Sequence, residues 1–297
     1  MSEPGKTYRI GDVTIVKVHE QLLRNVDPGF LFPTAQPGEF EIRAQSLDVS
    51  DLEDNRQQLI LSIHTWLVRT PRHVILIDTG AGNDKERPLN PFFHRLSNPY
   101  LANLAAAGVR PEEVDFVFNT HLHVDHAGWN TLLHDGRWKP TFPNARYVFP
   151  QAEEDYYSSP ASHNDVNIPS LGVYEDSVLP VIEAGLAERI EPEGGRYLDD
   201  FEFVPTKGHS IGHMSIRMIS QGEEAIFGGD VMHHPTQVQR PDWNTVFCEF
   251  ADEALRARRQ VLDAIADRRT LYLSTHFPGS SAGYVSRKGK GLIWTYA

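Results

Sequence analysis

Four side chains able to bind a metal fall within six positions of one short stretch, as His121, His123, Asp125 and His126. They follow an apolar run at residues 114–118 that predicts a β-strand. On an extended backbone, side chains two positions apart point the same way, so His121 and His123 can reach one cation together. Asp125 and His126 come where the strand gives way to a turn, and they can face a second cation nearby. Because zinc and related divalent ions accept imidazole nitrogen and carboxylate oxygen, this stretch predicts a metal site.

The pattern His-x-His-x-Asp-His at the end of a strand resembles the signature of the metallo-β-lactamase superfamily. The resemblance implies three further ligands downstream, and the sequence has the expected residue types as His209 after Gly208, Asp230 after Gly229, and His276 after an apolar run at 271–273. A further family feature is a strand that ends in Asp-Thr-Gly, and it is present here at Asp78. We expect Asp78 to support the site rather than to bind a metal. These motifs span residues 66–284, which is most of the chain.

The resemblance also implies how the ligands are shared between two ions. One ion would be held by His121, His123 and His209, and the other by Asp125, His126 and His276. Asp230 would bridge them, and we count Asp125 and Asp230 among the catalytic residues. A site with open coordination positions is typical of catalysis, and a hydroxide between two divalent ions is a nucleophile near neutral pH. We therefore expect a binuclear hydrolase with two divalent ions, Zn²⁺ first, although manganese, iron or cobalt would accept the same ligands.

Within the superfamily the ligand pattern is most similar to that of the quorum-quenching acyl-homoserine lactonases and the methyl-parathion-hydrolase-like group. The resemblance implies that the enzyme opens a lactone or cleaves a small carboxylic ester. The alternative is a phosphotriesterase or another small-molecule metallohydrolase of this fold, since the ligands are common to many substrates. A thiol or persulfide dioxygenase is less favoured because it would use one iron. A noncatalytic sensor would lack ligands, and none is missing here.

One position departs from that pattern. Many lactonases of this group have a tyrosine three residues after the bridging aspartate, and this sequence has His233 there. We expect His233 to act as the third catalytic residue, by donating to the developing oxyanion or by protonating the leaving alkoxide. The alternative is a histidine that only orients a metal ligand.

The elements that must position these residues follow from periodicity and turn signals. We expect strands at 8–18, 59–68, 73–77, 147–149, 201–206, 214–219, 224–227 and 270–274, and helices at 101–107, 151–157, 174–186 and 252–266. Because the motifs must meet at one site, residues 1–297 are expected to form a single domain. The resemblance implies an α/β (α+β) fold, a four-layer αββα sandwich of two β-rich halves with the metal site at one edge.

Two long stretches of weak periodicity, at 23–56 and 158–171, are expected to form lid loops over the site. Phe30, Leu31 and Phe32 at the centre of the first could form an apolar wall over the metal site, with local packing or a dimer contact as the alternative. Trp243, Phe247 and Phe250 follow the bridging aspartate, and we expect them either to line the substrate pocket or to pack beneath a loop.

Composition limits the partners. The net charge of −12 disfavours nucleic acid and anionic membranes as partners. No apolar run approaches the ~18 residues of a membrane-spanning helix, and the N-terminal residues show no export signal. The single cysteine, Cys248, excludes an internal disulfide and fits a reducing compartment. We expect a cytoplasmic protein that binds a small-molecule substrate, as a monomer or a homodimer.

Overall fold

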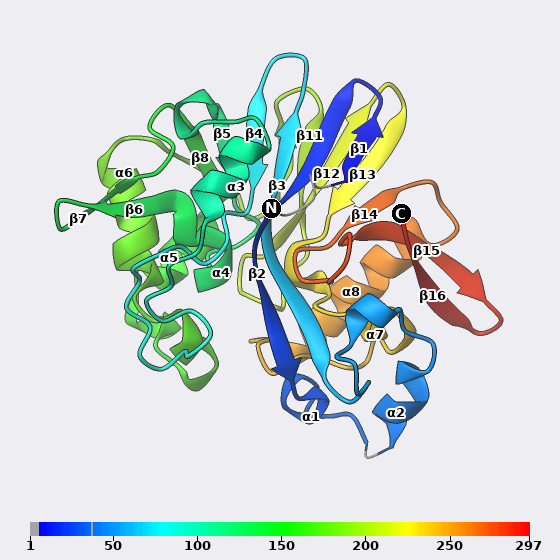
Figure 1. Cartoon of the computed structure of the whole chain (residues 1–297). Coiled ribbons are helices and arrows are strands. Elements are labelled where there is room, and N and C mark those ends of the chain that lie inside the picture. The colour runs from blue at the N-terminus through cyan, green and yellow to red at the C-terminus, as the bar shows by residue number, and fades with distance from the viewer. Residues whose placement is uncertain (1–5, 37) are drawn as a thin grey trace.

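Two seven-stranded sheets stack face to face, and helices cover their outer sides (Figure 1). The computed structural model describes residues 6–36 and 38–297; residues 1–5, where we expect no export signal, and residue 37, within the 23–56 stretch, lie outside it. The first sheet has the order β1-β2-β3-β4-β5-β8-β9, and the second runs β10 to β16 in sequence order. Strands β6 and β7 form a separate hairpin. The expected two-sheet α/β sandwich is confirmed.

The strands of the first sheet are β1 (Thr7–Ile10), β2 (Val13–Val26), β3 (Leu59–Arg69), β4 (Val74–Ile77), β5 (Phe116–Phe118), β8 (Arg146–Pro150) and β9 (Ala187–Ile190). Those of the second are β10 (Gly195–Tyr197), β11 (Phe201–Pro205), β12 (Met214–Ser220), β13 (Glu223–Phe227), β14 (Leu271–Leu273), β15 (Ala282–Lys288) and β16 (Gly291–Tyr296). The hairpin is β6 (Thr131–His134) with β7 (Arg137–Pro140). The α-helices are α1 (Pro28–Leu31), α2 (Glu39–Ala44), α3 (Tyr100–Ala106), α4 (Val124–Ala127), α5 (Gln151–Tyr157), α6 (Leu179–Glu183), α7 (Thr236–Gln239) and α8 (Ala251–Ile265).

The core forms where the inner faces of the sheets meet. On β3, Trp66 and Val68 point into this inter-sheet core, and Leu67 between them points outward, because side chains alternate along a strand. The outward side packs on α3, α5 and α6 through residues such as Leu104 and Val181. Both faces of β3 are therefore buried, which explains its long apolar sequence. Helix α8 covers the second sheet in the same way.

Several strands end at the same edge of the sandwich. Strands β4 and β5 are parallel in the first sheet, and β13 and β14 are parallel in the second. Strand β11 runs in the same direction as β13, because both pair antiparallel with β12. The loops after β4, β5, β11, β13 and β14 consequently meet at one edge, and these loops carry the sequence motifs.

Some sequence predictions are wrong in detail. The expected strand at 8–18 is a hairpin of β1 and β2, with Gly11 in the turn at φ 54°. The 23–56 stretch is not a plain loop: β2 continues to Val26, and α1, α2 and a 3₁₀ helix at Val49–Asp51 follow. Figure 1 shows α1 and α2 at the bottom of the view, beyond the C-terminal end of β2 and the N-terminal end of β3. The 158–171 stretch holds 3₁₀ turns at Pro160–Ser162 and Asp165–Ser170, and the helix expected at 174–186 is a π-helical turn followed by α6. In the described part of the chain, no helix is long and apolar enough to cross a membrane.

Candidate metal centre

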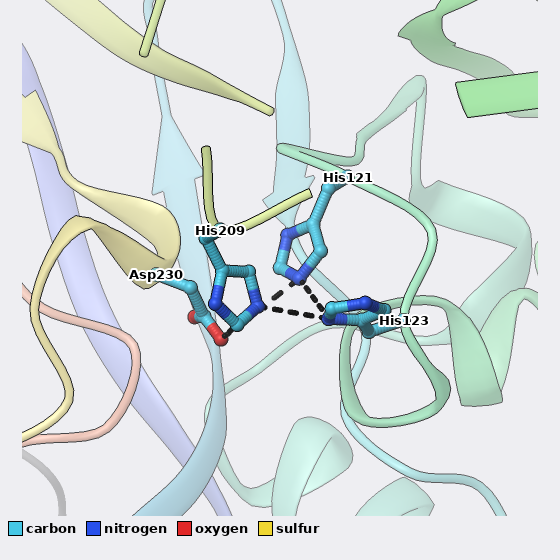
Figure 2. A group of neighbouring side chains, drawn as sticks. All are labelled: His121, His123, His209 and Asp230. Atoms are coloured by element: carbon cyan, nitrogen blue, oxygen red, sulfur yellow. Dashed lines mark hydrogen bonds and ion pairs between the residues drawn. The ribbon is translucent and has the colours of Figure 1, made fainter. Parts of the chain in front are cut away.

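Three histidines and one carboxylate surround a common point, as Figure 2 shows. His123 Nδ1 lies 3.0 Å from His121 Nε2 and 2.8 Å from His209 Nε2. Asp230 Oδ2 lies 3.1 Å from His209 Nε2 and 3.9 Å from His121 Nε2. Strand β5 ends before these histidines, at Phe118, so loop backbone rather than the strand presents His121 and His123 to each other. All four donors can contact a single ion.

A second group of donors lies on the other side of Asp230 and contains Asp125, His126 and His276. Asp125 and His126 are on the short helix α4, where the sequence predicts a turn. Asp125 lies 3.8 Å from His126 Nε2 and 3.6 Å from His276 Nε2. Asp230 Oδ1 is 3.1 Å from each of these two ring nitrogens. The structure thus brings together all the ligand positions expected from the sequence, with Asp230 between two groups.

The remaining ring nitrogens are held by partners outside the cluster. His126 Nδ1 donates to Asp78 at 2.9 Å, and His276 Nδ1 donates to the Ser62 carbonyl at 3.1 Å. His121 Nδ1 lies 3.0 Å from the Thr120 hydroxyl, which donates in turn to Asp78. Partners of this kind fix the tautomer and the orientation of a metal-binding histidine. Asp78 therefore supports both groups, as expected.

The polar atoms inside the cluster fit a metal better than they fit each other. Within the described residues, His126 Nε2 and Asp230 Oδ1 are buried and make no hydrogen bond, although they lie 3.1 Å apart. The two atoms are thus close enough for a hydrogen bond but are not aligned as donor and acceptor. Burial would raise the pKa of Asp230, but the surrounding histidines hold the pKa well below its usual range, so the carboxylate stays ionised. A buried anion surrounded by imidazole nitrogens is suited to divalent cations.

Two more histidines contact the cluster in different ways. His213 Nε2 accepts the backbone N–H of Asp230 at 2.8 Å, so this nitrogen is not available to an ion. His233 lies with its Nε2 3.2 Å from Asp230 Oδ2, and its ring stacks on His276 at a centroid distance of 5.2 Å. Burial lowers the pKa of His233 to about 3, so its imidazole is neutral and carries one N–H.

A cavity of about 160 Å³ opens above the cluster. We call its metal-binding side the floor, meaning the seven side chains of the two groups together with His233. Of these, His123, Asp125, His209, Asp230, His233 and His276 line the cavity, and His121 and His126 lie behind them. The wall is mainly apolar, with Asn90 and Ser170 as its polar members, and consists of Leu23, Val26, Phe30, Leu61, residues 89–93, Val124, Val166, Pro169, Ser170 and Phe247. No lysine or arginine lines this cavity in the described structure. The site therefore combines a highly polar floor with a wall that offers a substrate mainly apolar contact.

The structure separates the aromatic residues that we expected at the pocket. Phe30 and Phe247 line it and pack edge to face at 6.0 Å. Leu31, Phe32 and Trp243 are fully buried instead, with Trp243 packed against Phe32, so the expected wall contains only Phe30 of the first three. Phe250 does not line the cavity either. The sequence analysis missed residues 89–93, whose signal in the sequence would have been the adjacent aromatics Phe92 and Phe93 beside Pro91 in a segment without periodicity.

Comparisons with known proteins identify the family and the fold of this chain. A family model described as the Metallo-beta-lactamase superfamily matches residues 60–287. The crystal structure of hydrolase AbOPH in the β-lactamase superfamily is 24% identical, with a TM-score of 0.83 over 100% of this chain and 98% of that chain. AidC, a dizinc quorum-quenching lactonase in complex with a product, is 20% identical, with a TM-score of 0.79 over 99% and 97%. A probable metal-dependent hydrolase from Staphylococcus aureus is 22% identical, with a TM-score of 0.74 over 98% and 99%. These solved structures share the fold of this chain.

Proposed function

The chain is a metal-dependent hydrolase that belongs to the metallo-β-lactamase superfamily, and from this premise we propose that it uses two divalent ions to open a lactone or cleave a small carboxylic ester. The observation that carries the proposal is the position of Asp230. Its Oδ2 lies 3.1 Å from His209 Nε2 of one donor group, and its Oδ1 lies 3.1 Å from the Nε2 atoms of His126 and His276 in the other group. His276 Nε2 also lies 3.2 Å from Oδ2, so this carboxylate contacts both groups. A carboxylate in this position can bridge two ions.

In this proposal each donor group holds one ion. The first ion is held by His121, His123 and His209, the second by Asp125, His126 and His276, and both by Asp230. Zinc is the metal we favour, because nitrogen-rich sites with carboxylate suit it. When bound, two divalent ions supply a water that is deprotonated near neutral pH, and they polarise the oxygen of the bond under attack. Asp125 and Asp230 hold this reacting centre and are catalytic in that sense.

We assign the remaining catalytic role to His233. Its ring is at the floor of the cavity, is neutral and has no hydrogen-bond partner for Nδ1 among the described residues. A neutral imidazole has one N–H, which suits donation to the developing oxyanion or to the leaving alkoxide. Replacing His233 with Phe keeps a flat ring to stack on His276 but removes the donor. Turnover should fall ~10²-fold with metal content unchanged, as for other lost oxyanion donors; full turnover in H233F would remove this role.

The cavity supports a neutral, largely apolar substrate. An anionic group placed against this wall would lose its hydration and would find no lysine or arginine to pair with, which costs binding free energy. Lactones and small esters with an acyl or aryl group meet this requirement, and AidC, whose fold is shared, is a lactonase crystallised with a hexanoyl-homoserine product. Phosphotriesters are also uncharged, so the same observation makes phosphotriester hydrolysis the second candidate.

The test is a pH-stat screen of the zinc-loaded protein against lactones, aryl esters and phosphotriesters, with metal content measured in parallel. We expect two metals per chain and the highest kcat/KM for a lactone or ester. Activity confined to phosphotriesters would replace the leading proposal with the second candidate. A single bound iron and no hydrolysis would contradict both, and would favour the dioxygenase alternative.

A further inference from the structure

Glu153 is a buried carboxylate between the two loops that carry the first donor group. It is the third residue of α5 and is fully buried. Its Oε2 accepts the backbone N–H of Leu122 at 3.0 Å. Its Oε1 accepts the hydroxyl of Ser210 at 2.7 Å and the backbone N–H of Gly212 at 2.6 Å. One side chain thus joins the loop after β5 to the loop after β11.

The contacts of Glu153 are placed where they control ring positions. Leu122 lies between His121 and His123, so an anchor on its amide restrains both neighbouring residues. Ser210 follows His209 directly. On the other side of this loop, the carbonyls of His209 and Gly208 accept the backbone N–H groups of Glu249 and Phe250. The Glu153 side chain therefore helps to set the separation of the three imidazoles around their common point.

The His209 loop also packs closely against α5, which is a second sign that Glu153 holds this loop in place. A Cβ built on Gly212 would lie 3.0 Å from both Cγ and the backbone nitrogen of Glu153, so any larger residue at position 212 would press on Glu153. Glu153 has no basic partner in the described part of the chain, and a carboxylate buried without a cation is costly unless hydrogen bonds satisfy it. An apolar side chain would fill the position at less cost but could not join the two loops.

We propose that Glu153 is a positioning residue for the metal centre, a clamp that sets the spacing between the His121–His123 loop and the His209 loop. This inference rests on the proposed function, since it assigns those histidines to one ion. It predicts that loss of Glu153 changes the geometry and affinity of that ion's site. It does not require any contact between Glu153 and the substrate.

The experiment compares E153A and E153Q with D155N as a matched control, because Asp155 is exposed on the same helix and has no side-chain hydrogen bond in the described structure. Metal affinity is measured by chelator competition, and site geometry by the visible spectrum of the cobalt-substituted protein. E153A should bind metal ~10–100-fold more weakly, as is typical when a partner outside the ligand set is removed. Its cobalt spectrum should change, whereas D155N should match the wild type. Glutamine has one acceptor oxygen, so E153Q can serve only one loop and should be intermediate.

The outcomes separate this inference from the proposed function. A folded E153A with wild-type affinity and spectrum would overturn the clamp and leave the proposed function intact. If E153A does not fold, E153Q decides by the same two measurements. If the wild type itself binds no metal, the proposed function fails, and amide exchange tests the clamp alone. Faster exchange at Leu122 and Gly212 in E153Q would then support it, and unchanged exchange would overturn it.

Discussion

The floor and the wall of the pocket are stabilised in different ways. In the floor, each ligand histidine is buried, and partners such as Asp78, Thr120 and Ser62 fix three of the rings through their second nitrogens. In the wall, Phe30 and Leu89 are 48% and 64% exposed and contribute mainly apolar contact. Removing one member of a buried polar network leaves its partners without hydrogen bonds and costs much free energy, whereas removing one apolar contact costs less. We therefore expect substitutions in the floor to affect the chemistry, and substitutions in the wall to affect the choice of substrate.

The largest effect should come from the residue shared by both donor groups. D230A removes the proposed bridge and leaves several buried nitrogens without an anion. Metal stabilisation of a reacting centre contributes several kcal/mol, so kcat/KM should fall ~10³-fold or more. Turnover and elemental analysis of the purified variant check this together. If D230A keeps two metals and its kcat/KM stays within about a factor of ten of the wild-type value, the floor is not organised around Asp230.

A smaller effect is expected one step away from the ions. Asp78 accepts hydrogen bonds from His126, from the Thr120 amide and from the Thr120 hydroxyl. In D78N an NH₂ group, which donates, replaces one of the two accepting oxygens and cannot accept from one of these donors. Metal affinity should therefore fall ~10–100-fold. Asp84 is a matched control, because it is exposed and also has a left-handed backbone, at φ 62° against 52° for Asp78. Equal affinities of D78N and D84N would mean that the floor tolerates loss of its support.

The wall can be tested with a pair of phenylalanines three residues apart. Phe247 lines the cavity and packs against Phe30 and His233, whereas Phe250 does not line it. Loss of part of an aromatic contact is worth ~1.4 kcal/mol, so F247A should raise KM for a long-chain substrate about tenfold. The kcat, the metal content and the KM for a short-chain ester should change little. F250A should resemble the wild type; a loss of metal in F247A would contradict the division between floor and wall.

The same division explains how much could be predicted from sequence. The floor was predictable because each ligand type follows a buried strand, and strand ends in a sandwich converge at one edge. The wall was not, because apolar side chains such as Phe247 and Trp243 look alike in sequence whether they face a cavity or a core, and only packing separates them. Glu153 was missed for a related reason, since a glutamate in the first turn of a helix is common at exposed positions. Its burial depends on two loops distant in sequence.

The smallest effect concerns a carboxylate beneath the floor. Glu20 on β2 accepts the amides of Ala81 and Gly82 and the indole N–H of Trp129. Burial raises its pKa to about 7 from an ordinary value of 4.5, although these hydrogen bonds oppose the rise. A raised pKa in the folded state means that the folded form holds its proton more tightly than the unfolded form. The contribution of Glu20 to stability is therefore complete below pH 4.5 and is lost as the pH rises to about 7.

E20Q removes this titration, so the stability difference between wild type and variant should change with pH. Urea unfolding of the metal-free proteins at several pH values between 5 and 8 measures it, since the titration of the ligand histidines is common to both and cancels. The advantage of wild type over E20Q should decline up to about pH 7 and then level off, with little change in turnover. A constant difference across that range would mean that Glu20 ionises normally.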